Sequence, residues 1–301
     1  MKVTGFSFIR NANRYDYPIL EAIKSVLPLC DEFIITVGNS EDGTLELIQT
    51  LIADTSLENS NKDFAKIKII QTIWDDNLRE GGKVLAIETN KAFDAISADT
   101  DWCFYIQGDE VLHEKYIPII RKEMQDNLLN KDVEGLLFKY LHFYGSYDYV
   151  ANSRNWYRNE VRIIRNDKQI KSYKDAQGFR KNDQKLSVKL IDAYIYHYGW
   201  VKDPFVKSVE QEKNKFWHDD KWLAENVNTS PDVRFDYSKI DYLDIFEGTH
   251  PQVMQERIKK ANWDFKFDTN SKNFTLKGRF LHWIEQKTGW RIGEYKNFRK
   301  I

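Results

Sequence analysis

The sequence predicts an α/β protein in which a mixed sheet is flanked by helices and followed by a mainly helical C-terminal appendage. Three observations lead to this fold class. Over residues 1–110, short apolar runs alternate with segments of helical periodicity. Each of these apolar runs ends in a polar loop. After about residue 130, strand-like runs follow one another without clear helices between them, which indicates an antiparallel or mixed extension of the sheet.

The first part of the chain contains four candidate strands. They are the runs VTGFSFI at 3–9, FIITV at 33–37, IKIIQTI at 67–73 and WCFYI at 102–106. Short, mostly apolar runs rich in β-branched and aromatic residues are typical of strands buried on both faces. We therefore expect these four strands to form the parallel core of the sheet.

Three helices are predicted between these strands, because apolar residues recur there at intervals of three and four positions. The apolar stripes consist of Ile19, Ile23, Val26 and Leu27, then Leu45, Ile48, Leu51 and Ile52, and finally Leu85, Ala92, Phe93 and Ile96. Pro18 fits the first turn of the first helix, where no backbone N–H is needed. The resulting order is strand, helix, strand, helix, strand, helix, strand, as in a doubly wound sheet.

Beyond residue 130 the pattern changes. The runs VEGLLFKYLHFYG at 133–145, EVRIIR at 160–165 and LIDAYIYHYGW at 190–200 are predicted strands. A charged helix is predicted over 204–223, and a polar segment near 225–240 is a candidate linker.

The composition of the chain argues against several classes of protein. The formal net charge of −1 argues against a dedicated nucleic-acid-binding protein, which needs a strong positive field. Cys30 and Cys103 lie in apolar surroundings and are predicted to be buried free thiols in a reducing compartment. The N-terminal residues do not look like a signal peptide, and no run is long enough to span a bilayer. We therefore expect a cytoplasmic protein.

Each of the four predicted parallel strands is followed by a polar loop. The loops are RNANRYD at 10–16, GNSEDGT at 38–44, WDDNLREGG at 74–82 and QGDE at 107–110. Ligands of open α/β sheets bind outside the carboxyl ends of the strands, so these loops are expected to share one edge. The adjacent acids of QGDE then suggest a divalent-metal site, although a solvated turn would also explain them.

Three segments carry a resemblance to a known family. They are RNANRYDYPILEAIKSVLPLCDEFIITVGNSEDGT, WDDNLREGGKVLAIETNKAF and DWCFYIQGDEVL. Their order resembles the family 2 glycosyltransferases with the Rossmann-like GT-A fold, in particular bacterial members with a QADE-type loop in place of the DXD motif. The resemblance covers roughly residues 1–200 and is most specific up to residue 112. It implies transfer of a sugar from a nucleotide-sugar donor to an acceptor, usually with inversion.

The resemblance implies a division of the chain. Residues 1–240 would be the glycosyltransferase domain, with a nucleotide-binding half at 1–112 and an acceptor half at 113–240. Residues 241–301 would be a basic, aromatic appendage. The acceptor would be a glycan or a lipid-linked molecule of cell-surface polysaccharide synthesis.

Donor and metal contacts follow from the same resemblance. Asp109 matches the last Asp of the DXD motif, with Gln107 where the first would stand, and Glu110 and His197 are further candidate ligands of Mg²⁺ or Mn²⁺. The expected nucleotide-sugar contacts are Arg10, Asn11, Asn13, Asp42, Trp74, Asp76, Lys83 and Gln107. Some of these have a structural alternative: Asp42 could cap the following helix, Trp74 could be buried, and His197 could be a core residue.

An inverting transferase needs a group that deprotonates the acceptor hydroxyl. The family places it after the strand that resembles EVRIIR, where Asp175 is the first candidate, with Glu160 and Asp183 as alternatives. Tyr198 and Trp200 are candidates for an acceptor wall.

The C-terminal residues 251–301 hold twelve Lys or Arg against five Asp or Glu, with many aromatic residues among them. This segment either docks on an anionic membrane face, which would make the protein peripheral to the inner membrane surface, or packs its aromatic residues onto the catalytic domain. Two other functions stay open at this stage. One is a nucleotidyltransferase, and the other is a degenerate GT-A domain that binds a nucleotide sugar or acts as a scaffold.

Overall fold

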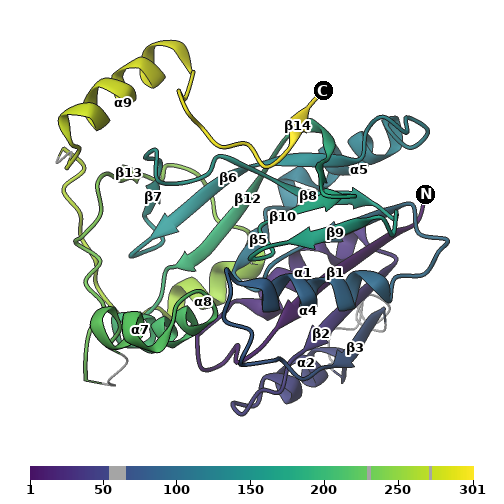
Figure 1. Cartoon of the computed structure of the whole chain (residues 1–301), viewed down its shortest axis with the longest axis horizontal. Helices are drawn as coiled ribbons and strands as arrows, with labels where there is room; N and C mark the ends of the chain where they lie inside the picture. Colours follow the sequence, from purple (N-terminus) through teal and green to yellow (C-terminus); the bar gives the residue numbers. More distant parts are fainter. Residues whose placement is uncertain (54–65, 229–231, 271–272) are drawn as a thin grey trace.

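A computed structural model describes residues 1–53, 66–228, 232–270 and 273–301 (Figure 1). Its centre is a large mixed sheet with helices on both sides, which confirms the predicted fold class.

The four predicted parallel strands are present. They are β1 (Val3–Ile9), β2 (Glu32–Val37), β3 (Ile67–Gln71) and β4 (Trp102–Tyr105). Their order across the sheet is β3, β2, β1, β4, and all three neighbouring pairs are parallel. Since the strands run in one direction, the four loops that follow them lie at one edge, as predicted.

Three helices connect these strands: α1 (Ile19–Val26), α2 (Thr44–Ala53) and α4 (Lys83–Asp94). Helices α1 and α2 contribute to the hydrophobic cluster on one face of the sheet, whereas α4 belongs to the cluster on the other face. The two layers follow from the alternation of side chains along each strand. In β4, for example, Phe104 packs in the first layer and Tyr105 in the second.

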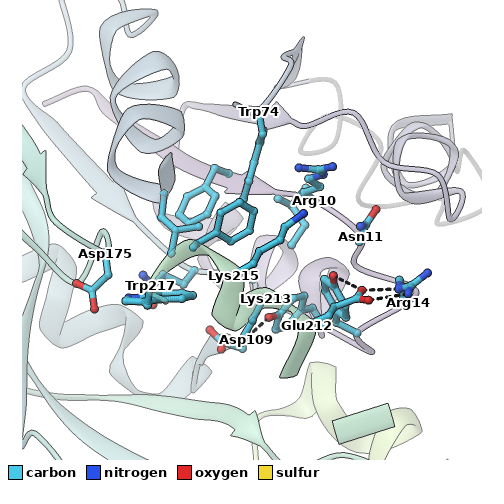
Figure 2. A pocket seen from close by; sticks show the side chains of 18 of the residues that line it. Arg10, Asn11, Arg14, Trp74, Asp109, Asp175, Glu212, Lys213, Lys215 and Trp217 are labelled. Carbon is cyan, nitrogen blue, oxygen red and sulfur yellow. Dashed lines mark hydrogen bonds and ion pairs between the residues drawn. The ribbon is translucent and has the colours of Figure 1, made fainter. Parts of the chain in front are cut away.

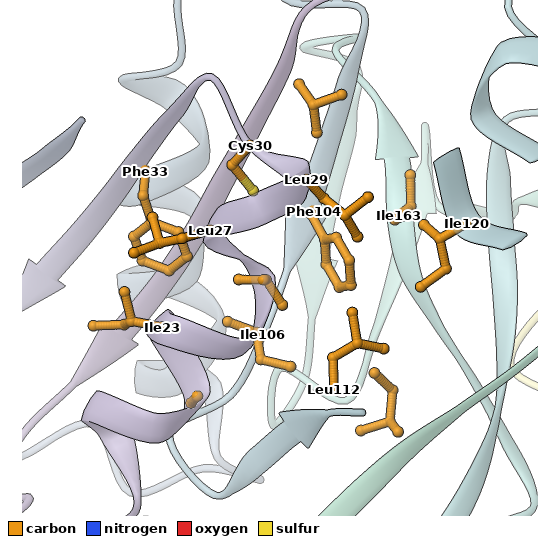
Figure 3. Packing of buried hydrophobic residues seen from close by; sticks show 14 of the residues in the cluster. Ile23, Leu27, Leu29, Cys30, Phe33, Phe104, Ile106, Leu112, Ile120 and Ile163 are labelled. Carbon is orange, nitrogen blue, oxygen red and sulfur yellow. The ribbon is translucent and has the colours of Figure 1, made fainter. Parts of the chain in front are cut away.

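The first layer forms a dense core between α1 and the sheet (Figure 3). Ile23, Phe33 and Phe104 are fully buried there, and Cys30 packs beside them. Both Cys30 and Cys103 are buried free thiols, as the sequence predicts. Burying side chains of this size contributes about 1.5–3 kcal/mol each, so this face of the sheet is a rigid support for the loops at its edge.

The second half extends the sheet. Strand β8 (Asn159–Arg165) lies antiparallel between β4 and β6 (Gly135–Tyr144), and β12 (Ser187–Trp200) runs parallel to β6. Strand β5 (Glu110–Leu112) pairs antiparallel with β12, so that His197 lies opposite Glu110. The mixed extension predicted for this half is therefore confirmed.

Smaller elements complete this half. Helix α5 (Ile117–Asp126) packs on the same side as α1, and β7 (Tyr149–Ala151) pairs with β6. Strands β9 (Ile170–Tyr173), β10 (Gly178–Lys181) and β11 (Gln184–Lys185) form a separate antiparallel sheet against α4.

The helix predicted over 204–223 is broken. The chain forms α6 (Pro204–Glu210), a 3-10 helix η3 (Gln211–Phe216) and, after a short interruption, α7 (Asp220–Asn226). Asp219 caps α7 by accepting a hydrogen bond from the backbone N–H of Trp222 at 2.8 Å, which explains the new start. The predicted linker near 225–240 lies partly outside the described residues, because 229–231 are not described.

The C-terminal segment contains β13 (Asp244–Ile245), α8 (Gln255–Lys260), α9 (Leu276–Thr288) and β14 (Arg299–Lys300). Strand β13 pairs with β7 and β14 pairs with β12, so both ends of the segment join the large sheet. The boundary at residue 240 stays a prediction. In the described parts of the chain, no helix combines the length and apolar character that crossing a membrane requires.

Candidate active site

A cavity of about 390 Å³ lies at the carboxyl edge of the parallel strands. All four predicted loops contribute to it, and residues of the second half of the chain close its remaining sides. The polar lining residues are Arg10, Asn11, Arg14, Tyr15, Tyr17, Glu41, Gln107, Asp109, Asp175, Glu212, Lys213 and Lys215. Figure 2 shows Asp175 and Trp217 at one end of this group, and Asn11 and Arg14 at the other.

Six of the predicted site residues line this cavity, namely Arg10, Asn11, Trp74, Gln107, Asp109 and Asp175. Two of them carry buried donors: within the described residues, Arg10 Nε and Trp74 Nε1 have no hydrogen-bond partner. A buried donor without an acceptor costs about 1–3 kcal/mol, so such groups are rare unless a ligand satisfies them.

Trp74 also explains the glycine in the second loop. A Cβ atom at Gly38 would lie 2.4 Å from Trp74 Nε1. The indole therefore occupies the space of any side chain at position 38. Trp74 is only 7% exposed and packs between Phe8 and Phe216, with ring centroids 5.8 Å away in both cases. This end of the cavity is aromatic and suits a planar ring.

Asp109 lines the cavity and faces His197, which does not line it, with 3.4 Å between Asp109 Oδ2 and His197 Nε2. A hydrogen-bond chain behind His197 fixes its tautomer. His142 Nε2 donates to the carbonyl oxygen of Tyr157 at 2.7 Å, and burial holds the pKa of His142 well below its ordinary value. A neutral His142 therefore accepts at Nδ1 from His197 Nδ1, 3.2 Å away.

These hydrogen bonds occupy Nδ1 of His197, so only its Nε2 faces the carboxylate of Asp109. A lone pair there would oppose the negative charge, so the arrangement needs a cation, either a proton on Nε2 or a metal ion. A carboxylate oxygen and an imidazole nitrogen are a suitable partial ligand set for Mn²⁺ or Mg²⁺. The residues present thus fit the divalent ion that the resemblance implies, although no group of three or more His, Cys, Asp or Glu in the described chain forms a metal-binding cluster.

The expectation for Glu110 is wrong. Its side chain is fully buried, and Arg162 donates to both carboxylate oxygens at 2.7 and 2.8 Å. The Tyr140 hydroxyl donates to Oε1 at 2.7 Å and the Gln107 backbone N–H to Oε2 at 3.1 Å. These four donors already satisfy the carboxylate, so Glu110 is a structural partner of Arg162 and does not belong to the candidate metal ligands.

Four further predicted nucleotide contacts do not line the cavity. Asn13 donates to the carbonyl oxygen of Asp42, and Asp42 accepts from Thr44 Oγ1 at 2.6 Å, which is the structural alternative for this loop. Lys83 is half-exposed and pairs with Glu80 on the surface. Asp76 forms ion pairs with Arg10 at 2.6 Å and with Lys215 at 3.1 Å. It therefore orients two cations that line the cavity, although it does not line the cavity itself.

Asp175 lies in the turn between β9 and β10. Its neighbours Lys174 and Ala176 both have left-handed backbone, with φ of 52° and 61°. Such backbone costs non-glycine residues roughly 1–2 kcal/mol each, and strain of this kind is often found at functional sites. Burial raises the pKa of Asp175. Gln107 Nε2 donates to the carbonyl oxygen of Ala176 at 3.2 Å and thereby ties this turn to the loop of Asp109.

The two alternatives to Asp175 are less suitable. Asp183 is exposed and lies in the two-residue turn between β10 and β11, where Asn182 and Asp183 both have positive φ, as in a type I′ turn. Glu160 is buried and does not line the cavity.

Tyr198, predicted for the acceptor wall, is a core residue that stacks on Phe143 with 4.8 Å between ring centroids. Trp200 is half-buried against Lys207.

A cluster of cations lies near Asp109, formed by the buried Lys202 and Lys207 and the half-buried Lys213. Glu210 accepts from Lys202 at 3.0 Å and from Lys207 and Lys213 at 2.6 Å each. Three ammonium groups therefore surround one carboxylate, and burial lowers the pKa of Lys202 to about 8. Burial alone would raise the pKa of Asp109, but His197, Lys213 and Lys202 hold it well below its ordinary value. The positive excess favours an anionic ligand beside Asp109.

Sequence reasoning missed the segment 211–217, which supplies Glu212, Lys213, Lys215, Phe216 and Trp217 to the cavity. Arg14 binds both carboxylate oxygens of Glu212, at 2.6 and 2.7 Å, and fastens the segment to the first loop. The only signal in the sequence is the mixture of charges and aromatic residues in EQEKNKFW, which a solvated helix shares.

The pH dependence of stability is predicted to reflect Glu160. Burial raises the pKa of Glu160 to about 8, with Glu110 and Asp175 raising it and Arg162 and Arg180 opposing them. Because this pKa exceeds the unfolded value of about 4.3, the associated stability is present at low pH and is lost as the pH rises through about 8.

Urea unfolding at pH values between about 5 and 8.5 measures this effect against Glu160→Gln, which cannot ionise. The wild type should lose stability relative to the variant over this range. Parallel curves for the two proteins would show that Glu160 ionises normally in the folded state.

The sequence matches no family model and no curated protein. Among solved structures, it is similar to residues 1–349 of TarS from S. aureus in complex with UDP, at 15% identity and a TM-score of 0.38, over 69% of this chain and 62% of that one. It is also similar to glucosyl-3-phosphoglycerate synthase from Mycobacterium tuberculosis in complex with Mn²⁺, UDP and glucosyl-3-phosphoglycerate, at 17% identity and a TM-score of 0.30, over 48% of this chain and 45% of that one.

A third similar structure is 4-diphosphocytidyl-2C-methyl-D-erythritol synthase from Anaerococcus prevotii, at 12% identity and a TM-score of 0.38, over 67% of this chain and 89% of that one. The chain thus spans less than two thirds of the TarS fragment and of the mycobacterial synthase. At these identities and TM-scores, the likenesses assign no function to this chain.

Proposed function

We propose that this protein is an inverting glycosyltransferase that takes its sugar from a nucleotide-sugar donor and transfers it to a glycan or lipid-linked acceptor. The observation that carries the proposal is the cavity in which Asp109 with its partner His197, a group of cations, an aromatic end and Asp175 meet. The order of the loops and the QGDE segment also support the proposal, because they resemble those of the family 2 glycosyltransferases.

The donor would bind with its base at the aromatic end, near Trp74, and its diphosphate near Lys213 and Lys215. Arg10 and these lysines stabilise the negative charge that the leaving diphosphate gains. Asp109 and His197 would hold Mg²⁺ or Mn²⁺, which supplies further positive charge to the diphosphate when bound.

Asp175 would act as the general base. The acceptor oxygen attacks the anomeric carbon, its proton passes to the Asp175 carboxylate, and the bond from the anomeric carbon to the phosphate oxygen breaks with its electron pair on the nucleoside diphosphate. A carboxylate whose pKa is raised by burial is a better proton acceptor than an exposed one.

Donor binding tests the proposal directly. Unfolding of the full chain would be followed with UDP-, GDP-, CMP- and dTDP-sugars, each with and without Mn²⁺. A donor at about one hundred times its dissociation constant stabilises the fold by about 2.7 kcal/mol, so one donor class is expected to raise the melting temperature, and more so with Mn²⁺. If no donor shifts the melting temperature, the proposal is wrong. If a donor binds but its sugar is never transferred or hydrolysed, the protein is a binding module.

Gly199→Ala is predicted to weaken Mn²⁺ binding by about tenfold or more. A Cβ atom at position 199 would lie 2.5 Å from Asp109 Oδ2 and 2.9 Å from His197 Nε2. It would therefore crowd both proposed metal ligands. Isothermal titration of Mn²⁺ in the presence of the nucleoside diphosphate measures the effect. Gly278→Ala in α9 is the control, because Gly278 does not line the cavity and has no left-handed φ, and a Cβ atom there would lie no closer than 3.2 Å to another atom, Thr275 Oγ1. Unchanged Mn²⁺ affinity in Gly199→Ala would remove Asp109 and His197 from the proposed metal site.

A further inference from the structure

Helix α9 is well formed but has no buried residue. Thr275 caps its first turn by accepting from the Gly278 N–H at 3.1 Å, and Gly289 ends it with a φ of 68°. In Figure 1 the helix lies to one side of the large sheet, at the upper left, with an extended segment at each end. Most of its surface is therefore available to a partner.

The helix is attached to the protein on the side that carries Glu285 and the half-buried Leu281. Glu285 is only 11% exposed and accepts from Arg291 Nε at 2.7 Å. Arg154 and Arg158 lie 3.3 and 3.8 Å from the same carboxylate. On the same side, the ring of His282 packs against Phe274, with 4.9 Å between centroids.

The opposite face is apolar and exposed. Leu276, Phe280 and Trp283 recur at intervals of four and three, and they are 85%, 61% and 57% exposed. At about 100° per residue, this stripe lies roughly 180° from Glu285. An ordinary surface helix turns its apolar stripe inward, whereas α9 leaves this stripe exposed.

Positive charge flanks this stripe. Lys277, Arg279 and Lys287 are exposed beside it, and Glu285, the one acid in the sequence of the helix, is turned inward. We call Leu276, Phe280 and Trp283 with these three cations the outer face of α9. Beyond the helix, Trp290 and Tyr295 are exposed as well, at 64% and 71%.

We propose that the outer face of α9 docks on the surface of an anionic lipid bilayer. The leucine and the two aromatic rings enter the boundary between headgroups and acyl chains, while the three cations contact anionic headgroups. A second copy of the chain is a poorer occupant, because a twofold contact between two outer faces brings six cations together without an acid. The proposal does not depend on the identity of the sugar donor.

Co-sedimentation of the full chain with vesicles tests this proposal. The vesicles contain either phosphatidylcholine alone or phosphatidylcholine with about 30% phosphatidylglycerol. We expect binding to the anionic vesicles at least about tenfold tighter than to the neutral ones, and weaker binding as salt is added. Phe280→Ser/Trp283→Ser and Lys277→Gln/Arg279→Gln/Lys287→Gln should each lose about tenfold or more in affinity.

Leu129→Ser is the matched control, because Leu129 is an exposed leucine (87%) outside the C-terminal segment and its loss should leave vesicle binding unchanged. Melting temperatures of all variants check that folding is preserved, which the exposure of the substituted side chains predicts. Absent vesicle binding, or binding that the double serine variant retains, overturns the proposal. A dimer in solution that Phe280→Ser/Trp283→Ser abolishes would identify a second copy as the occupant instead.

Discussion

Replacing Asp109 by asparagine is expected to lower the rate of sugar transfer by at least about a hundredfold. Asparagine keeps the size of the side chain but presents a neutral amide to His197 Nε2 and to the lysines behind it. A neutral amide holds a divalent ion more weakly than a carboxylate does, so the stimulation by Mn²⁺ should disappear as well. The measurement is release of nucleoside diphosphate from the donor found by thermal shift, with Mn²⁺ titrated at a fixed donor concentration.

Asp94→Asn is the matched control for this variant. Asp94 is a half-exposed carboxylate that pairs with Lys171 on the surface, so its loss should leave the transfer rate unchanged. Because His197 and the lysines favour the charged form of Asp109, the Asp109 variant is also expected to be somewhat less stable, and the assay belongs well below its melting temperature. Wild-type turnover with full Mn²⁺ stimulation in Asp109→Asn would show that this carboxylate takes no part in the reaction.

The parallel half of the fold could be predicted because its signals are local. Strand β1 covers the predicted run Val3–Ile9 without a shift, since its side chains alternate between two hydrophobic layers and its neighbours are strands on both sides. The loops that follow the strands could be assigned to one edge for the same reason. The strand order along the chain is therefore sufficient to predict that Arg10, Trp74 and Asp109 lie together.

The adjacent acids of QGDE show what the local sequence cannot predict. The side chain of Asp109 lines the cavity, whereas Glu110 begins β5 and turns into the core. Which of two neighbouring carboxylates meets the cavity depends on a partner 52 positions away, Arg162, and no spacing within the loop reveals it. The same holds for the segment 211–217, whose place at the cavity depends on the contact of Glu212 with Arg14, 198 positions away.

Replacing Arg162 by methionine is expected to lower the free energy of unfolding by about 3–5 kcal/mol, since it leaves the carboxylate of Glu110 buried without its cation. Both side chains have no exposed surface, so water cannot compensate for the loss. Arg162 also donates from Nη1 to the carbonyl oxygens of Val161 and Gln177 at 3.0 Å each, and the second bond fixes the turn that carries Asp175. Urea unfolding monitored by circular dichroism gives the free energy.

The double variant Glu110→Leu/Arg162→Met separates the ion pair from the packing around it. Without either charge the site is apolar, so the double variant should regain much of the stability that Arg162→Met loses. Lys122→Met is the control, because the pair of Lys122 with Asp126 is a surface i, i+4 pair and should contribute less than about 1 kcal/mol. If Arg162→Met costs no more than Lys122→Met, Glu110 is not held by Arg162 in solution and becomes available again as a ligand beside Asp109.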